Sequence, residues 1–193
     1  MYSRVLLDKP IIIIDFEATC VSNDEKPIDS EIIEFAAIKV NKEGQLIDEF
    51  CEFVKPVINP KLSNYCKELT TITQEQVDKA DYFPEVYKRF IEWKGDVDLW
   101  CSWGRYDYRQ LKDDCSIHDV PFTMNKHINI KSVYRELFKF KRAGLQIALK
   151  QMNLEFEGTH HRGICDCKNI YKIYLKIINK IRGLKNERNE NRG

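Results

Sequence analysis

The feature that most constrains the fold is a run of four isoleucines, Ile11–Ile14, that ends at an acidic residue. β-Branched residues favour strands, and the run is too short for a free-standing helix. Pro10–Phe16 is therefore predicted to be a buried strand. Because side chains alternate between the two faces of a strand, Asp15 and Glu17 are expected to point the same way.

The segments after this strand predict an α/β fold with a mixed sheet. Ile32–Val40 and Leu46–Val54 have strand-like patterns and are joined by a turn at Lys42–Gln45, so the three strands are expected to form an antiparallel meander. Helical and strand-like segments then alternate, which is typical of α/β chains. Short strands are predicted over Val97–Cys101 and Ile128–Ile130, and helices over Leu62–Leu69, Gln74–Ala80, Phe83–Trp93, Tyr106–Cys115, Ser132–Lys139, Gly144–Met152 and Cys165–Ile181.

One domain is expected from the length and composition. The chain has 193 residues, of which 43% are hydrophobic and 32% are charged, and these values exclude a wholly disordered chain. Residues 1–182 are predicted to form this domain. Residues 183–193 contain almost no apolar side chains and are predicted to be a polar, flexible C-terminal tail.

Charge, hydropathy and cysteine content indicate the cellular context. The formal net charge is +1, so bulk charge gives no argument for a nucleic-acid partner. The most apolar run is a few residues long, and neither a membrane span nor a signal peptide is predicted. The seven cysteines have no disulfide-framework spacing. We expect a cytoplasmic protein with reduced thiols and no membrane partner.

Acidic residues at the ends of predicted elements are the candidates for a functional site. Asp15 and Glu17 are either a solvated strand end or a divalent-cation site, since hard cations prefer oxygen ligands. Asp107 lies near the start of a predicted helix, where it would also favour the helix dipole. His161 and Asp166 are five residues apart, so His161 is expected on the loop before the last helix and Asp166 on that helix. Each residue alone has an ordinary structural interpretation, but the set predicts a cation site.

The ordered set of four acids and a histidine resembles the motif of the DEDDh 3′→5′ exonucleases. Asp15–Cys20 is similar to the Eri-type exoribonuclease branch, which includes the histone-mRNA 3′-end exonuclease and its prion-protein-interacting relative. The resemblance extends from about residue 10 to about residue 180. Thr71 stands where the family usually has glycine, and Cys165 where an acid is frequent, but neither is a metal or base position. Further similar segments are Leu62–Cys66, Leu69–Gln74, Val77–Ala80 and His161–Ile170.

The resemblance implies a ribonuclease-H-like sheet with a two-metal active site. It implies that two Mg²⁺ or Mn²⁺ ions are held by the four acids and that the histidine is the general base. The implied reaction is hydrolysis of single-stranded RNA from the 3′ end to 5′-mononucleotides, with DNA as a further candidate substrate. The residues assigned to metal binding are Asp15, Glu17, Asp107 and Asp166, and the base is His161.

Substrate contacts are predicted around this site, because aromatic faces stack on unpaired bases. Phe16 is expected on the opposite strand face from the two acids, which favours core packing, whereas the resemblance favours a base contact. Trp103 and Tyr65 are the other stacking candidates. The resemblance also assigns Leu69 and Thr70 to the terminal-nucleotide pocket, and the backbone amides of Ala18 and Thr19 to the 3′ hydroxyl.

A basic stretch is a candidate path for the RNA backbone. Residues 126–150 carry seven Lys or Arg side chains and one Glu. This stretch is either a phosphate track leading to the acidic site or the solvated face of two helices. Lys139, Lys141 and Arg142 are the residues predicted to contact phosphates. If they do, raising the salt concentration should weaken RNA binding steeply.

Three other functions are compatible with parts of the sequence. The same fold could bind single-stranded RNA without cutting it, although a pure binding module has no need of mutually repelling acids. A DNA-directed exonuclease is the second alternative, since no residue pattern reads the 2′ hydroxyl. A zinc cluster is the third, and it is disfavoured because two cysteines two residues apart diverge on a helix. Its members would be His160, His161, Cys165 and Cys167. The sequence identifies no protein partner.

Overall fold

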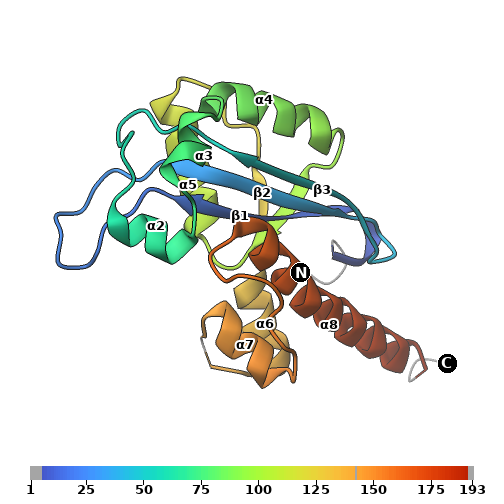
Figure 1. Cartoon of the computed structure of the whole chain (residues 1–193). Helices are drawn as coiled ribbons and strands as arrows, with labels where there is room; N and C mark the ends of the chain where they lie inside the picture. The colour runs from blue at the N-terminus through green and yellow to red at the C-terminus, as the bar shows by residue number, and fades with distance from the viewer. Residues whose placement is uncertain (1–5, 142, 191–193) are drawn as a thin grey trace.

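The computed structural model places β1 (Ile11–Ala18) at the centre of a five-stranded sheet of order β3-β2-β1-β4-β5 (Figure 1). β1 pairs antiparallel with β2 (Ile32–Val40), which pairs antiparallel with β3 (Leu46–Phe53). On its other side β1 pairs parallel with β4 (Leu99–Ser102), and β4 pairs parallel with β5 (Lys126–Asn129). The predicted mixed sheet with an antiparallel meander at one side is confirmed.

Helices cover both faces of this sheet (Figure 1). The structure describes residues 6–141 and 143–190. The helices after β3 are α2 (Asn64–Thr70), α3 (Gln74–Asp78), α4 (Phe83–Lys94), α5 (Tyr106–Ile117), α6 (Ile130–Phe138), α7 (Leu145–Gln151) and α8 (Gly163–Glu190). Side chains of α4 and α5 pack on one face, and those of α6, α7 and α8 on the other. No helix in the described ranges is both long enough and apolar enough to cross a membrane.

The alternation of β1 divides its side chains between two hydrophobic cores. Ile11 and Ile13 belong to the core formed with α8, whereas Ile12 and Ile14 belong to the core under α4 and α5. Each of the four is fully buried, and burying such a side chain contributes roughly 1.5–3 kcal/mol, so the register of the strand is strongly fixed. Asp15 and Glu17 continue the first series, which places both carboxylates on the α8 side of the sheet.

The C-terminal helix is longer than predicted. α8 continues past the predicted end at Ile181 to Glu190, so the predicted domain boundary at residue 182 falls inside a helix. The Lys, Glu and Arg residues of this stretch have high helix propensity. The Arg182 guanidinium also donates to the Glu43 carbonyl at 3.2 Å, which ties the helix to the turn between β2 and β3. Residues 191–193 of the predicted tail lie outside the described ranges.

Several element ends differ by a few residues from the predictions, and two of them lie near the acidic residues. β1 continues beyond Phe16 to Ala18, with an irregular register between Glu17 and Ala18. The chain leaves β5 one residue earlier than expected, because Asn129 caps α6 by accepting the Ser132 N–H at 3.1 Å. Both changes lie at the edge of the sheet where the acidic residues gather.

Candidate active site

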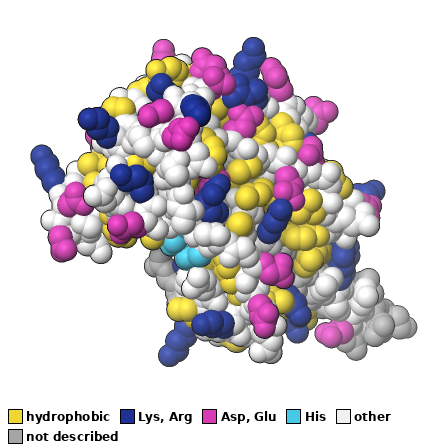
Figure 2. All heavy atoms as spheres, in the orientation of Figure 1, with side chains coloured by type: hydrophobic (Ala, Val, Ile, Leu, Met, Phe, Trp, Pro, Cys, Tyr) yellow, Lys and Arg dark blue, Asp and Glu magenta, His cyan; other side chains and the backbone are white. Residues whose placement is uncertain are grey.

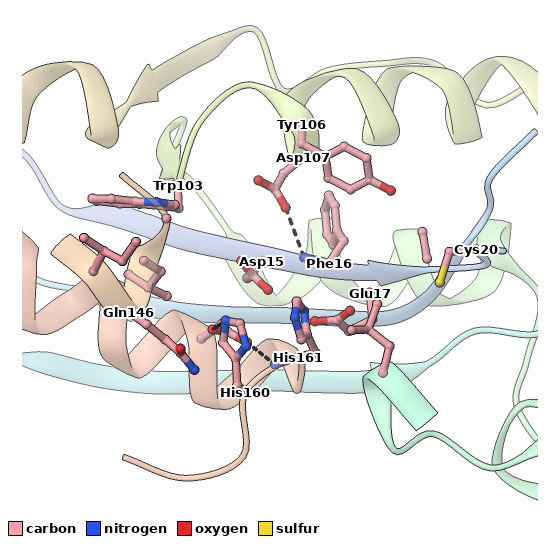
Figure 3. Close-up of a pocket in the computed structure, with 16 residues that line it drawn as sticks. Asp15, Phe16, Glu17, Cys20, Trp103, Tyr106, Asp107, Gln146, His160 and His161 are labelled. Atoms are coloured by element: carbon pink, nitrogen blue, oxygen red, sulfur yellow. Dashed lines mark hydrogen bonds and ion pairs between the residues drawn. The ribbon is translucent and has the colours of Figure 1, made fainter. Parts of the chain in front are cut away.

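The predicted catalytic residues meet in a cavity of about 510 Å³ at the carboxyl end of β1 (Figure 3). β1 supplies Asp15 and Glu17, and the first turn of α5, which follows β4, supplies Asp107. The first turn of α8 supplies Asp166, and the loop before it supplies His161. Histidine side chains reach the surface between α2 and the α6–α7 region (Figure 2). Since β1 and β4 are parallel, their carboxyl ends share one edge of the sheet, which brings these distant residues together.

Three of the four acids form a compact carboxylate cluster. One oxygen each of Asp15, Glu17 and Asp166 lie within 4.8 Å of one another, which confirms that the two β1 acids share a face. In the view of Figure 3, Asp107 lies on one side of the β1 ribbon and the two labelled histidines lie on the other. The Asp107 Oδ1 accepts the Phe16 N–H at 3.2 Å, which fixes this acid against β1.

Burial dominates the electrostatics of these acids. It raises the pKa of Asp15 well above its usual value, and neighbouring carboxylates, Asp107 foremost, raise it further. Burial also raises the pKa of Glu17 to about 9 and the pKa of Asp166 to about 7. The residues described as lining the cavity include no lysine or arginine. The cavity therefore offers hard oxygen ligands without a cationic side chain to offset them, and this donor set fits divalent cations.

His161 is held beside the carboxylate cluster in a left-handed backbone conformation, with φ at 61°. The backbone N–H of His161 donates to Asp166 Oδ2 at 2.8 Å, so the loop is tied to the first turn of α8. Burial lowers the pKa of His161, and the His160 ring, whose centroid lies 3.9 Å away, lowers it further. An imidazole that is neutral near pH 7 can accept a proton, so the geometry fits a general base.

The structure contradicts the zinc-cluster alternative. The Cys167 side chain is buried, and its Sγ lies 3.6 Å from the Ile13 carbonyl and 3.5 Å from the Ala36 carbonyl. It therefore packs against the sheet, whereas His160 and His161 line the cavity. As the helical spacing predicted, the two cysteines of α8 cannot join the histidines around one ion.

Four of the predicted substrate residues line the cavity: Phe16, Ala18, Leu69 and Trp103. The Phe16 ring is almost fully buried, with its centroid 4.5 Å from that of Phe35, so core packing accounts for most of its surface. The Trp103 indole N–H is buried and has no hydrogen-bond partner in the described part of the chain. An aromatic ring with an unused donor in the cavity wall is suited to contact a base.

Three predicted substrate residues are placed elsewhere. The Thr19 N–H donates to the Glu31 carbonyl at 2.8 Å, and its hydroxyl accepts the Glu31 N–H at 2.9 Å. The Thr19 amide is therefore already used by a hydrogen bond just beyond the paired ends of β1 and β2, which does not favour the predicted contact with a 3′ hydroxyl. Thr70 is buried and donates to the Cys66 carbonyl at 2.8 Å, so its hydroxyl caps its own helix instead. Tyr65 is exposed on α2 and does not line the cavity.

The sequence analysis does not assign several residues of the cavity wall to the site, among them Tyr106, Gln146 and Ile147. Tyr106 directly precedes Asp107 and is 51% exposed; an aromatic residue next to a candidate acid is the signal that could have found it. Gln146 and Ile147 lie in the first turn of α7. Ile147 is apolar but 56% exposed. An apolar residue outside the buried face of an amphipathic helix is the sequence signal that could have indicated it.

The architecture of this chain is shared with known nucleases. A mixed sheet with acids at the carboxyl end of its central strand matches the ribonuclease-H-like fold of solved DEDDh nucleases, as predicted. The family model RNase_T, described as an exonuclease, matches residues 12–174. The chain belongs to this RNase_T exonuclease family.

Individual relatives agree with this placement. The 3′-5′ exoribonuclease 1 of Rattus norvegicus is 35% identical over 181 residues, which cover 87% of this chain and 52% of the relative. The 3′-5′ exonuclease Snipper of Drosophila melanogaster is 32% identical over 193 residues, covering 87% of this chain and 69% of Snipper. The nuclease domain of 3′hExo, a DEDDh family member solved with bound rAMP, is 34% identical with a TM-score of 0.83, covering 89% of this chain and 92% of that one. The chain spans about half the length of the exoribonuclease 1 relatives that it matches.

Proposed function

We propose that this chain is a metal-dependent 3′→5′ exonuclease that hydrolyses single-stranded RNA from its 3′ end and releases 5′-mononucleotides. The observation that carries the proposal is the carboxylate cluster, in which Asp15, Glu17 and Asp166 oxygens lie within 4.8 Å of one another. The names of the relatives, 3′-5′ exoribonuclease and 3′-5′ exonuclease, support the reaction and its direction. The rAMP bound to the 3′hExo nuclease domain supports RNA over DNA. The cytoplasmic location stays a prediction.

The acids of the cavity are proposed to hold two divalent cations, Mg²⁺ or Mn²⁺. Asp15, Glu17 and Asp166 would be ligands through the oxygens that already face one another, and Asp107 would contribute from the first turn of α5. Bound cations would polarise the phosphoryl oxygens and supply the positive charge that the lining residues lack. Their charge would also keep the acids ionised near neutral pH despite the burial that raises each pKa.

His161 is proposed as the general base that takes a proton from the attacking water. The imidazole must be neutral for this step, and burial together with the adjacent His160 lowers the pKa of His161 in the required direction. Asp166 would also position the base, because its Oδ2 accepts the backbone N–H of His161 and so fixes the loop that carries the imidazole.

The terminal nucleotide is proposed to lie against the apolar and aromatic part of the cavity wall. Trp103 and Tyr106 supply aromatic faces, and Leu69 and Ile147 supply apolar contacts. Stacking of a base on an aromatic side chain stabilises binding by roughly 1–3 kcal/mol and tolerates any base. This wall would therefore hold the 3′ nucleotide without selecting its sequence.

The basic stretch after α6 is proposed to contact phosphates further along the strand. Lys139 and Lys141 are exposed, and Lys139 lines a second cavity of about 410 Å³ together with Arg135 and Phe140. Arg142, the third predicted contact, lies outside the described residues. Basic and acidic side chains are interspersed on the face seen in Figure 2, so local contacts, rather than a broad positive field, would guide the strand.

The experiment that tests this function uses single-stranded RNA labelled at its 5′ end. With Mg²⁺ or Mn²⁺ the purified protein should produce a ladder that shortens by single nucleotides, and EDTA should stop it. Asp15→Ala should abolish cleavage while the circular dichroism spectrum stays unchanged. Asp113→Ala, which removes an exposed acid of α5 outside the cavity, is the matched control and should remain fully active.

Each other outcome of this experiment favours a different function. RNA that is bound but never cut under any metal would favour the non-cleaving RNA-binding module. Faster degradation of a matched DNA oligonucleotide would favour the DNA-directed exonuclease. Undiminished cleavage by Asp15→Ala would contradict the assignment of the carboxylate cluster.

A further inference from the structure

A further buried acid, Glu34, lies next to the carboxylate cluster but outside it. Glu34 is on β2 directly opposite Glu17 of β1 in the antiparallel register, so the two side chains share one face of the sheet. Glu34 is completely buried, and its charge raises the pKa of both Glu17 and Asp166. An acid in this position is unfavourable unless its own partners compensate for its burial.

In the described part of the chain, the partners of Glu34 come from Arg162 of the loop that carries His161, from Gly163 at the start of α8, and from β3. The Arg162 guanidinium donates through Nη2 at 2.9 Å and through Nε at 3.2 Å to Glu34 Oε1. The Gly163 N–H donates to Glu34 Oε2 at 2.8 Å. The Cys51 thiol of β3 completes the set at 3.5 Å. The two residues that directly follow His161 are thus held by one buried carboxylate.

The start of α8, directly after this loop, has no room to shift toward the sheet. A Cβ on Gly163 would lie 2.7 Å from the Ala36 Cβ and 2.9 Å from the Asp15 carbonyl oxygen, so the backbone at the start of α8 packs directly on β1 and β2. His161 itself has φ at 61°, a conformation that non-glycine residues rarely adopt without external support. The contacts that supply this support are the Asp166 bond on one side and the Glu34 bonds on the other.

We propose that Glu34 and Arg162 are a pair of positioning residues that hold His161 over the carboxylate cluster. The inference rests on the proposed function, since it concerns the general base of that reaction. Neither residue lines the cavity, and neither is a catalytic residue in this account. They affect the rate of the reaction only by fixing the position of the His161 imidazole.

Steady-state kinetics of a double-mutant cycle test this claim. Arg162→Ala should lower kcat by about 10- to 100-fold, since a base displaced by about 1 Å loses that much rate, while KM changes little. In the His161→Ala background, Arg162→Ala should cause no further loss, because no base remains to be positioned. A merely structural role would lower the residual activity again by a similar factor, and that result would overturn the proposal.

Matched variants keep the test independent of folding. Arg162→Ala leaves Glu34 buried without its cation, so the neutral double variant Glu34→Gln/Arg162→Met is measured as well, with melting temperatures for each. The neutral variant should melt near the wild type and still show the loss of kcat. Arg162→Lys, which keeps the charge but not the planar fork, should recover part of the rate. Arg89→Ala breaks the Arg89–Glu52 ion pair away from the cavity and should leave kcat unchanged.

A measurement without substrate separates this proposal from the proposed function. In protein labelled with ¹³C-histidine, the His161 ring signal is assigned by its absence in His161→Ala. The signal should shift or broaden in Arg162→Ala and in the neutral double variant, but not in Arg89→Ala. An unchanged His161 signal would contradict the positioning claim even if the enzyme is active. If the wild type proves inactive, the proposed function fails and the ring signals still decide the positioning claim.

Discussion

The molecule buries two groups of acids, and the two groups differ in what surrounds their oxygens. Glu31 is 1% exposed, and its carboxylate accepts the N–H groups of Val57, Ile58 and Asn59 at 2.6–2.8 Å. Asp114 is also fully buried and accepts the Ile32 N–H at 3.0 Å. In the cavity, by contrast, oxygens of Asp15, Glu17 and Asp166 face one another, although Asp166 also accepts the backbone N–H of His161.

This difference distinguishes acids that stabilise the fold, such as Glu31 and Asp114, from the acids of the carboxylate cluster, which are suited to bind a cation. A buried carboxylate with backbone donors is stabilised by the chain itself, and it organises the loop that supplies those donors. Carboxylates that face each other without a cation destabilise the folded state. We therefore expect substitutions in the two groups to have opposite effects on activity and on stability.

The largest effect is expected for Asp15→Asn. Removing one ligand of a divalent cation costs several kcal/mol of transition-state stabilisation, which corresponds to a loss of about 10³-fold or more in kcat/KM. The melting temperature of the metal-free protein should stay the same or rise, because the substitution also removes a repulsive charge. Kinetics and calorimetry on the same preparation check both parts. A lower melting temperature together with normal activity would place Asp15 in the structural group.

Glu31→Gln is expected to give the reverse result. The amide keeps one acceptor oxygen but loses the charge that binds the N–H groups of residues 57–59. Hydrogen bonds to a charged group contribute about 1.5–3 kcal/mol, so the free energy of unfolding should fall by about that amount in urea denaturation. At a temperature where the variant is folded, kcat should stay within a few-fold of the wild type. An equally large loss of activity would show that the two groups are not separable.

The stability of the metal-free protein should fall as the pH rises from about 4 to about 9. The pKa of Glu17 is raised to about 9 and that of Asp166 to about 7, while unfolded carboxyls titrate near 4. In this window the folded chain holds protons that the unfolded chain has released, so its stability decreases with pH. Melting temperatures in EDTA should show this slope, and Glu17→Gln should reduce it. Mg²⁺ should restore most stability at the alkaline end, whereas identical slopes in wild type and variant would refute this explanation.

The smallest effect is expected for exposed charge. Lys139→Ala/Lys141→Ala should weaken binding of a long single-stranded RNA a few-fold and lower the slope of log K against log salt by about 1–2. Cleavage of a dinucleotide should be unaffected, because it does not reach this stretch. Titrations at several salt concentrations measure the slope. A slope equal to that of the wild type would assign these lysines to an ordinary solvated surface.

Local patterns explain why the fold and the main acids could be predicted. The buried isoleucine run requires a central strand, and the strict alternation that follows it places Asp15 and Glu17 on one face. The helix starts before Asp107 and Asp166 are also local features. Their convergence at one edge follows from the parallel pairing of β1 and β4, which an α/β pattern favours.

Contacts between distant segments explain what could not be predicted. The Thr19 amide donates to the Glu31 carbonyl just beyond the paired ends of β1 and β2, and no local pattern shows that bond. Ile147 joins the cavity only because α7 packs beside α8, which turns part of its first turn toward the acids. Glu34 looks like an ordinary strand residue until the loop bearing Arg162 folds over it. Such roles depend on tertiary packing and can be recognised only in the folded structure.

The most direct test of this account is a calorimetric titration of the metal-free protein with Mn²⁺, performed on the wild type, Asp15→Asn and Glu31→Gln. The account predicts saturable binding to the wild type and to Glu31→Gln, and its loss in Asp15→Asn. Equal binding by Asp15→Asn, or no binding by the folded wild type, would contradict the claim that the facing acids form a cation site.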